Sequence, residues 1–289
     1  MFCPTILALS TLFLTTAPLI RPLAPPSPNE TLTENKSHAI VETRTDVGWV
    51  GASQTFHVIV LLTPDAGWHV YWKNPGASGA PTEIEIDAPD GFIVGEPIFP
   101  RPMTFHDEEG ETFGYDEPVA IFIPVTAPET LHDGQVEFNL TTSWLACKKI
   151  CVMGEQENTL HISTNALQQG PLHRDMQLSR WFSALPRPLD DLEKGKSVVS
   201  GGILHITGES EMRPIQFVGV ERTGVRFGAL QELSREGDTF RLSVPVKLDL
   251  SLKQQIDGST LVVEGLLLLG SKNDDPSYVV HLRVNFTNN

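Results

Sequence analysis

Two cysteines four residues apart are the side chains of this sequence with the clearest chemical potential. Cys147 and Cys151 lie in residues 143–152, SWLACKKICV, just after a strand-like run that ends near Leu140. Residues four apart across a three-residue turn face one another, at Cα separations that a disulfide accepts, about 4.4–6.8 Å. The spacing therefore predicts that the cysteines flank a tight hairpin and can form a disulfide.

The neighbouring residues favour a reactive pair over a structural one. Lys148 and Lys149 place positive charge beside both sulfurs, which favours the thiolate that performs disulfide exchange. Closing a five-residue ring contributes only about 2 kcal/mol of stability, and a strained short ring is easier to reduce than a relaxed one. We therefore expect a redox function for Cys147 and Cys151.

Two other functions are open to the same residues. The pair could be a spectator disulfide in a structural interaction module. Alternatively, Cys147, Cys151 and Met153 form a compact set of soft ligands suited to Cu(I), as in a copper-handling protein. The nine histidines show no H-x3-H or H-E-x-x-H spacing and no second Cys pair joins them, so we expect no zinc site and no cofactor.

The elements that must position this hairpin have the pattern of β-strands. Short β-branched or alternating runs, punctuated by Gly and Pro, favour an antiparallel sandwich over a βαβ fold. In the first half they cover residues 56–62, 82–87, 119–125 and 135–140, and in the second half residues 202–207, 214–220, 239–250, 259–269 and 278–286. One short helix is expected over residues 175–182. The predicted fold class is all-β, with two antiparallel β-sandwich domains.

The amino terminus indicates export. Residues 5–20 are almost wholly apolar or small and the first charge is Arg21, which is typical of a secretory signal ending near Ala24. The rival interpretation is an uncleaved membrane anchor, because the run approaches the minimum spanning length of roughly 17 residues. Cys3 would leave with a signal peptide, and the remaining even pair suits a compartment where disulfides persist. The net charge of −15 argues against nucleic acid as a partner.

We expect five segments along the chain. They are a signal peptide (residues 1–24), a flexible lead-in (25–37), a redox-active domain (38–165), a linker with the short helix (166–195) and a second β-sandwich domain (196–289).

Three motifs together resemble a known family. They are residues 67–76, GWHVYWKNPG, followed by Gly79 and Pro81; residues 113–117, FGYDE; and residues 144–152, WLACKKICV. The combination resembles the amino-terminal domain of DsbD/ScsB-type thiol:disulfide interchange proteins over roughly residues 38–165, and more vaguely beyond.

The resemblance implies an immunoglobulin-like periplasmic domain with protein-disulfide reductase-type activity. Such a domain is reduced by a thioredoxin-like domain and in turn reduces other periplasmic oxidoreductases of the thioredoxin fold. Cys147 and Cys151 would be its redox pair, with Cys151 forming the mixed disulfide with a partner. Full-length members continue into a membrane domain and a thioredoxin domain, which this sequence lacks, so we expect a membrane electron-transfer protein to act in trans. The direction of electron flow stays open.

The resemblance also implies an aromatic shield over the redox pair. Phe105, Phe113 and Tyr115 are the candidates for it, with ordinary core packing as the alternative for each. For Trp68, Trp72 and Trp144 we expect core positions.

Overall fold

The computed structural model describes residues 37–106, 108, 110–173, 175–249 and 260–285. The predicted signal peptide and all but the last residue of the lead-in lie outside this part of the chain. The described residues fold almost entirely into β-strands, with one α-helix, α1 (Met176–Ser183), and one 3-10 helix, Leu189–Asp191. Neither of these helices is long and apolar enough to cross a membrane.

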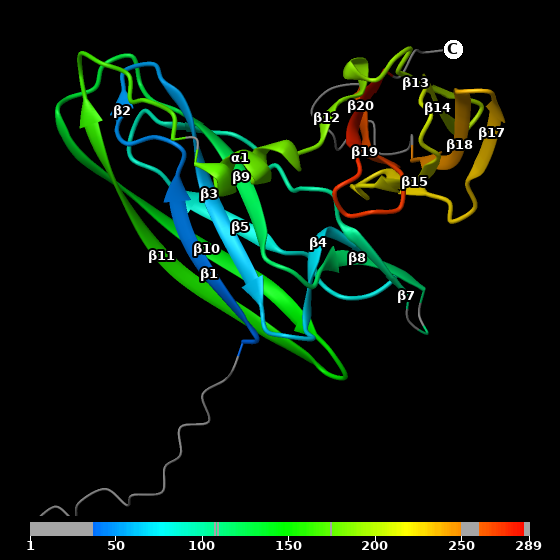
Figure 1. Ribbon diagram of the computed structural model, residues 1–289, viewed down its shortest axis with the longest axis horizontal. Coiled ribbons are helices and arrows are strands. Elements are labelled where there is room, and N and C mark those ends of the chain that lie inside the picture. Colours follow the sequence, from blue (N-terminus) through cyan, green and yellow to red (C-terminus); the bar gives the residue numbers. More distant parts are fainter. Residues whose placement is uncertain (1–36, 107, 109, 174, 250–259, 286–289) are drawn as a thin grey trace, which may run out of the picture. The chain divides into compact units, whose positions relative to one another are not determined.

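Two sheets form the first sandwich, which we define as strands β1 to β11 (Figure 1). One sheet has the order β1 (Ala39–Thr45), β3 (Thr55–Pro64), β9 (Val119–Thr126) and β6 (Ile93–Val94). The other has the order β2 (Val50–Gly51), β11 (Cys151–Asn165), β10 (Gly134–Cys147), β4 (His69–Gly76), β8 (Glu111–Tyr115) and β7 (Met103–His106), with β5 (Glu83–Asp87) also paired to β10. These pairings are antiparallel except for the short β2–β11 pair.

Alternation along β3 shows why this sequence forms a sandwich. Phe56, Val58, Val60 and Leu62 are fully buried and point into the core between the two sheets, as a period of two requires. Ile59 lies on the opposite face of β3, where it packs against helix α1. The helix therefore covers the outer face of the β1–β3–β9–β6 sheet.

Two further sheets form the second sandwich, which we define as strands β12 to β20. One has the order β12 (Arg187–Pro188), β20 (Ser277–Asn285), β19 (Thr260–Leu269) and β15 (Pro214–Gly219). The other has the order β13 (Lys196–Ser200), β14 (Ile203–Glu209), β18 (Thr239–Leu248) and β16 (Val225–Phe227), with β17 (Glu232–Glu236) also paired to β18.

Strand β19 is buried on both faces. Leu267 and Leu269 belong to the core of the second sandwich, whereas Leu266 and Leu268 belong to the core cluster of the first. The described residues accordingly lie in one compact unit. The predicted all-β fold class is confirmed, while the domain boundaries at residues 165/166 and 195/196 stay predictions.

Candidate redox site

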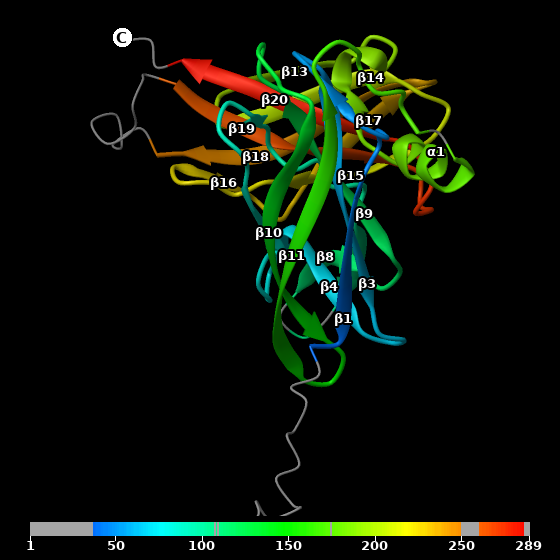
Figure 2. The same ribbon diagram turned by 90° about the vertical axis from the view of Figure 1, so that its left-hand side faces the viewer.

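The predicted cysteine hairpin is present, and it is longer than the sequence pattern indicated. Strands β10 and β11 run side by side along their length (Figure 2), in register from Gly134 with Thr164 to Cys147 with Cys151. The two cysteines form a disulfide, with their Cα atoms 4.2 Å apart. In the turn between them, the Lys148 backbone N–H donates to the Ile150 carbonyl at 3.1 Å.

The two sulfur-bearing residues differ in their access to solvent. Cys147 is only 4% exposed, whereas Cys151 is exposed. The sheet topology explains the difference, because β10 has β11 on one side of Cys147 and β4 on the other. At Cys151, strand β11 has a described partner only in β10, since its pairing with β2 lies at the far end of the strand. A second protein can therefore reach the Cys151 side of the disulfide.

His69 is the residue at this site that the sequence analysis did not single out. It is the cross-strand partner of Cys147 in the β4–β10 pairing. Directly opposed residues point to the same face of a sheet, with Cβ atoms about 4.5–5.5 Å apart. The imidazole therefore lies beside Cys147, on the face that carries the disulfide. No local pattern could have found it, because the pairing joins residues far apart in the sequence.

The three candidate shield aromatics lie in different surroundings. The ring of Phe105 is partly exposed and stacks on His69, with centroids 4.7 Å apart and planes inclined by 22°. Phe113 and Tyr115 are buried in the core of the first sandwich. The Tyr115 hydroxyl donates to the Pro100 carbonyl at 2.8 Å, and burial raises its pKa well above the ordinary value. Of the three, only Phe105 is shown in contact with a neighbour of the cysteine pair.

Cations and apolar side chains surround the exposed sulfur. Lys148 and Lys149 are exposed, and the Lys148 ammonium lies 3.5 Å from the Ala66 carbonyl in the loop between β3 and β4. Ile150 and Met153 are large apolar residues on either side of Cys151, and they are 66% and 61% exposed. Such side chains next to a reactive group are typical of a surface that meets another protein.

The predicted tryptophans lie mainly in the core. Trp72 and Trp144 are fully buried. Trp68 is partly buried and stacks on His38 with ring centroids 3.5 Å apart.

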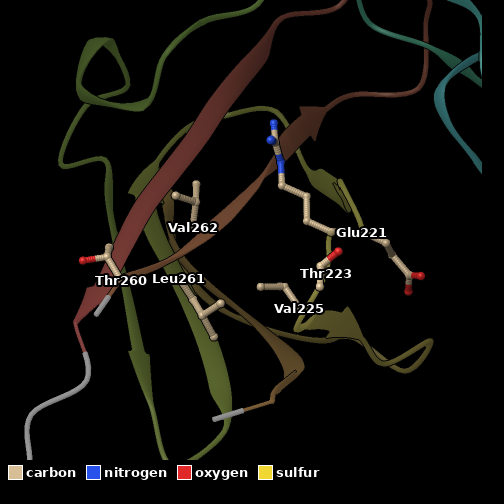
Figure 3. Close-up of a pocket in the computed structure, with 7 residues that line it drawn as sticks. Glu221, Thr223, Val225, Thr260, Leu261 and Val262 are labelled. Carbon is tan, nitrogen blue, oxygen red and sulfur yellow. The ribbon is translucent and has the colours of Figure 1, made fainter. Parts of the chain in front are cut away.

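Within the described part of the chain, no three or more His, Cys, Asp or Glu side chains form a group that could hold a metal ion. One pocket lies in the second sandwich, lined by residues 221–223, Val225 and residues 260–262 (Figure 3). We assign it no role.

These features define an immunoglobulin-like β-sandwich domain with a disulfide at the end of a long hairpin. Residues 39–163 match the family described as "Thiol:disulfide interchange protein DsbD, N-terminal". No curated protein sequence matches the chain.

Solved structures extend the likeness in fold. The N-terminal periplasmic domain of ScsB from Proteus mirabilis is 18% identical, with a TM-score of 0.57, over 87% of this chain and 95% of that one. The likeness therefore extends over both sandwiches. The DsbD N-terminal domain of Neisseria meningitidis in its reduced form is 16% identical, with a TM-score of 0.30, over 48% of this chain and 96% of that one.

Proposed function

We propose that this protein exchanges disulfides with thioredoxin-fold proteins in the periplasm, using Cys147 and Cys151 as its dithiol–disulfide couple. One observation carries the proposal: within the part of the chain that matches the DsbD N-terminal family, an exposed cysteine is bonded to a buried one. Exchange requires a thiolate to approach one sulfur along the S–S bond while the other sulfur leaves. The different exposures of the two residues select Cys151 for attack and Cys147 for departure.

The reaction balances without any cofactor. A thiolate of a reduced partner attacks the Cys151 Sγ, the Cys147–Cys151 bond breaks, and its electron pair leaves on the Cys147 Sγ, which takes up a proton. The partner's second thiolate then attacks the partner's own sulfur in the mixed disulfide, releasing the Cys151 thiolate. Two electrons pass to this protein, which holds Cys147 as a thiol protonated by solvent and Cys151 as a thiolate, and the partner is left with a disulfide. The same steps reversed pass electrons from Cys147 and Cys151 to an oxidised partner.

The environment supplies two aids to this exchange. Lys148 and Lys149 favour the thiolate form of the released cysteine. Ile150 and Met153 offer apolar contacts to the partner around its reacting sulfur.

The assignment to the periplasm has separate support. The apolar run at residues 5–20 is typical of an export signal, and the ScsB domain of similar fold is periplasmic. In that compartment the pair can persist as a disulfide until a partner reduces it. A membrane electron-transfer protein is the reductant that we propose.

Trapping of the mixed disulfide tests the proposal. In a Cys3→Ser background, the Cys147→Ser variant keeps the exposed thiol and loses the one that would resolve the mixed disulfide. Incubated with an oxidised thioredoxin-fold protein, it should accumulate a covalent complex that a thiol reductant dissolves. The matched Cys151→Ser variant keeps only the buried thiol and should form little complex.

Two outcomes would contradict the proposal. One is equal trapping by the two single-cysteine variants, which would show that exposure does not select Cys151. The other is a Cys151→Ser protein that still exchanges disulfides with such partners at the wild-type rate.

A further inference from the structure

The β7–β8 hairpin, which carries Phe105, is held on both of its strands by the second sandwich. Gln216 of β15 makes the contact that joins the two strands. Its Nε2 donates to the Glu111 carboxylate at the start of β8 at 2.6 Å, and its Oε1 accepts from the Thr104 hydroxyl in β7 at 3.4 Å. Thr104 immediately precedes Phe105, so this contact lies one residue from the aromatic ring at the redox site.

Arg101 holds the segment that leads into β7. Its guanidinium donates to the carbonyls of Leu269, Gly270 and Pro276 at 2.6, 3.0 and 3.3 Å. These carbonyls belong to the end of β19 and to the loop that follows it. Because the five donors of a guanidinium form a rigid fork, several simultaneous contacts fix the position of this segment closely.

The position of the hairpin determines the position of Phe105. The strand order is β4–β8–β7, so the Phe105 ring reaches across β8 to stack on His69 of β4. His69 in turn lies opposite Cys147. Strand β7 is at the edge of its sheet and pairs with β8 alone, over residues 103–106. A short edge strand with one neighbour is a marginal element, and side-chain contacts from outside the sheet can decide whether it stays in place.

We infer that the second sandwich is a brace for the redox site, in which contacts to Gln216 and Arg101 hold the β7–β8 hairpin so that Phe105 stays stacked on His69, the cross-strand partner of Cys147, and limits access to the disulfide from the Cys147 side. This inference rests on the proposed redox function of Cys147 and Cys151. Gln216 and Arg101 act through Phe105 and are positioning residues. Strand β15 and the end of β19 thereby have a role at the redox site, although both lie outside residues 39–163, the part of the chain that matches the DsbD family.

A swap of the two hydrogen-bonding groups tests the brace. Gln216→Glu places a carboxylate against the Glu111 carboxylate, so the hydrogen bond between the two side chains is lost. The double variant Gln216→Glu/Glu111→Gln again has one amide donor and one carboxylate acceptor, now exchanged between the two positions. The readout is the second-order rate of disulfide reduction by dithiothreitol, a small reagent that needs no docking surface. We expect Gln216→Glu to raise this rate about two- to tenfold. Loss of one hydrogen bond increases by that factor the equilibrium constant for displacement of the β7–β8 hairpin from its packed position. The double variant should return to the wild-type rate.

Three further variants separate positioning from general destabilisation. Arg101→Ala should accelerate reduction like Gln216→Glu. In a Phe105→Ala background, which is itself fast, Gln216→Glu should add nothing. Lys194→Ala removes a surface ion pair with Glu209 elsewhere in the second sandwich and should leave the rate unchanged.

The brace is overturned if Gln216→Glu and Arg101→Ala both fold and are reduced at the wild-type rate, or if Phe105→Ala is no faster than wild type. Failure of the proposed function gives a different result. The rates of reduction by dithiothreitol would still differ among the variants as described, but none of the proteins, wild type included, would exchange disulfides with thioredoxin-fold proteins.

Discussion

Cys147 and Cys151 are direct cross-strand partners, yet Cys147 is only 4% exposed and Cys151 is exposed. The difference arises from their neighbours in the sheet, since β4 covers one side of Cys147 and no described strand flanks Cys151 in the same way. In a disulfide, the more accessible sulfur is the one that an incoming thiolate attacks. The fold thus assigns different roles to two residues of the same chemical type.

The exposed apolar residue in the cysteine turn should contribute to partner binding. Ile150 is 66% exposed, so Ile150→Asp should leave folding unchanged. Burying the new carboxylate against a partner costs free energy, and we expect a KM for a thioredoxin-fold partner at least about tenfold higher. Leu230→Asp is the matched control, because Leu230 is 83% exposed in the second sandwich and lies outside the proposed contact. Equal KM values for the two variants would exclude docking through Ile150.

Removing the lysines of the turn should make the couple harder to reduce. Lys148 and Lys149 stabilise a thiolate, which exists only in the reduced form, so they raise the reduction potential. Each exposed charge contributes about 0.2–1 kcal/mol, which for a two-electron couple is about 5–20 mV. The Lys148→Gln/Lys149→Gln protein should therefore have a potential about 10–40 mV more negative than wild type. A higher potential in that variant would contradict this account, and Lys194→Gln should have no effect.

Phe105 and Phe113 should behave differently when truncated, although both lie on the β7–β8 hairpin. Phe113 is a core residue, and Phe113→Ala should cost about 3–5 kcal/mol of unfolding free energy. Phe105 is partly exposed, so Phe105→Ala should cost only about 0.5–1.5 kcal/mol from the lost ring contact with His69. Denaturant unfolding measures both values. If the two losses were similar, Phe105 would be a core residue and not part of the redox site.

A partly buried carboxylate joins β4 to the second sandwich and should make stability depend on pH in the acid range. Glu264 is 14% exposed and accepts from Lys73 and Arg222, each at 2.6 Å. Burial opposes ionisation, but these two cations outweigh it and hold the pKa of Glu264 below its ordinary value of 4.5. Because the folded-state pKa is the lower one, the carboxylate contributes stability above the unfolded value, and this is lost as the pH falls through the folded value.

The Glu264→Gln variant tests that linkage. At neutral pH it should lose about 1.5–3 kcal/mol, the contribution of hydrogen bonds to a charged group. Below about pH 4.5, its stability should fall less steeply than that of wild type. Glu232→Gln, at an exposed position of β17, is the control. Parallel pH profiles for Glu264→Gln and wild type would show that this ion pair does not contribute to acid sensitivity.

The sequence predicts those parts of the fold that depend on local pattern. The runs at residues 56–62 and 239–250 correspond to β3 and β18. Both strands were predictable because alternation and β-branching are visible in adjacent residues. The cysteine hairpin was equally local, since one turn of three residues brings Cys147 opposite Cys151. The four consecutive leucines at residues 266–269 break the alternation of apolar and polar residues because β19 is buried on both faces.

The rest of the site depends on pairings between distant residues. His69 meets Cys147 only because β4 lies beside β10, and a motif search cannot foresee which residues of the two strands come into register. The sequence could not show which of Phe105, Phe113 and Tyr115 lies at the redox site, because strand alternation does not reveal which ring stacks on His69. The contacts of Gln216 with Thr104 and Glu111 span more than a hundred residues and have no local signal at all.

The reduction potential of the Cys147–Cys151 couple tests the central claim most directly. It is measured by equilibrating the protein with thiol–disulfide buffers of known potential and alkylating the free thiols. An electron-transfer couple should lie among the shuttling oxidoreductases, at about −270 to −120 mV. A potential below about −300 mV would identify the bond as a structural disulfide and contradict the account.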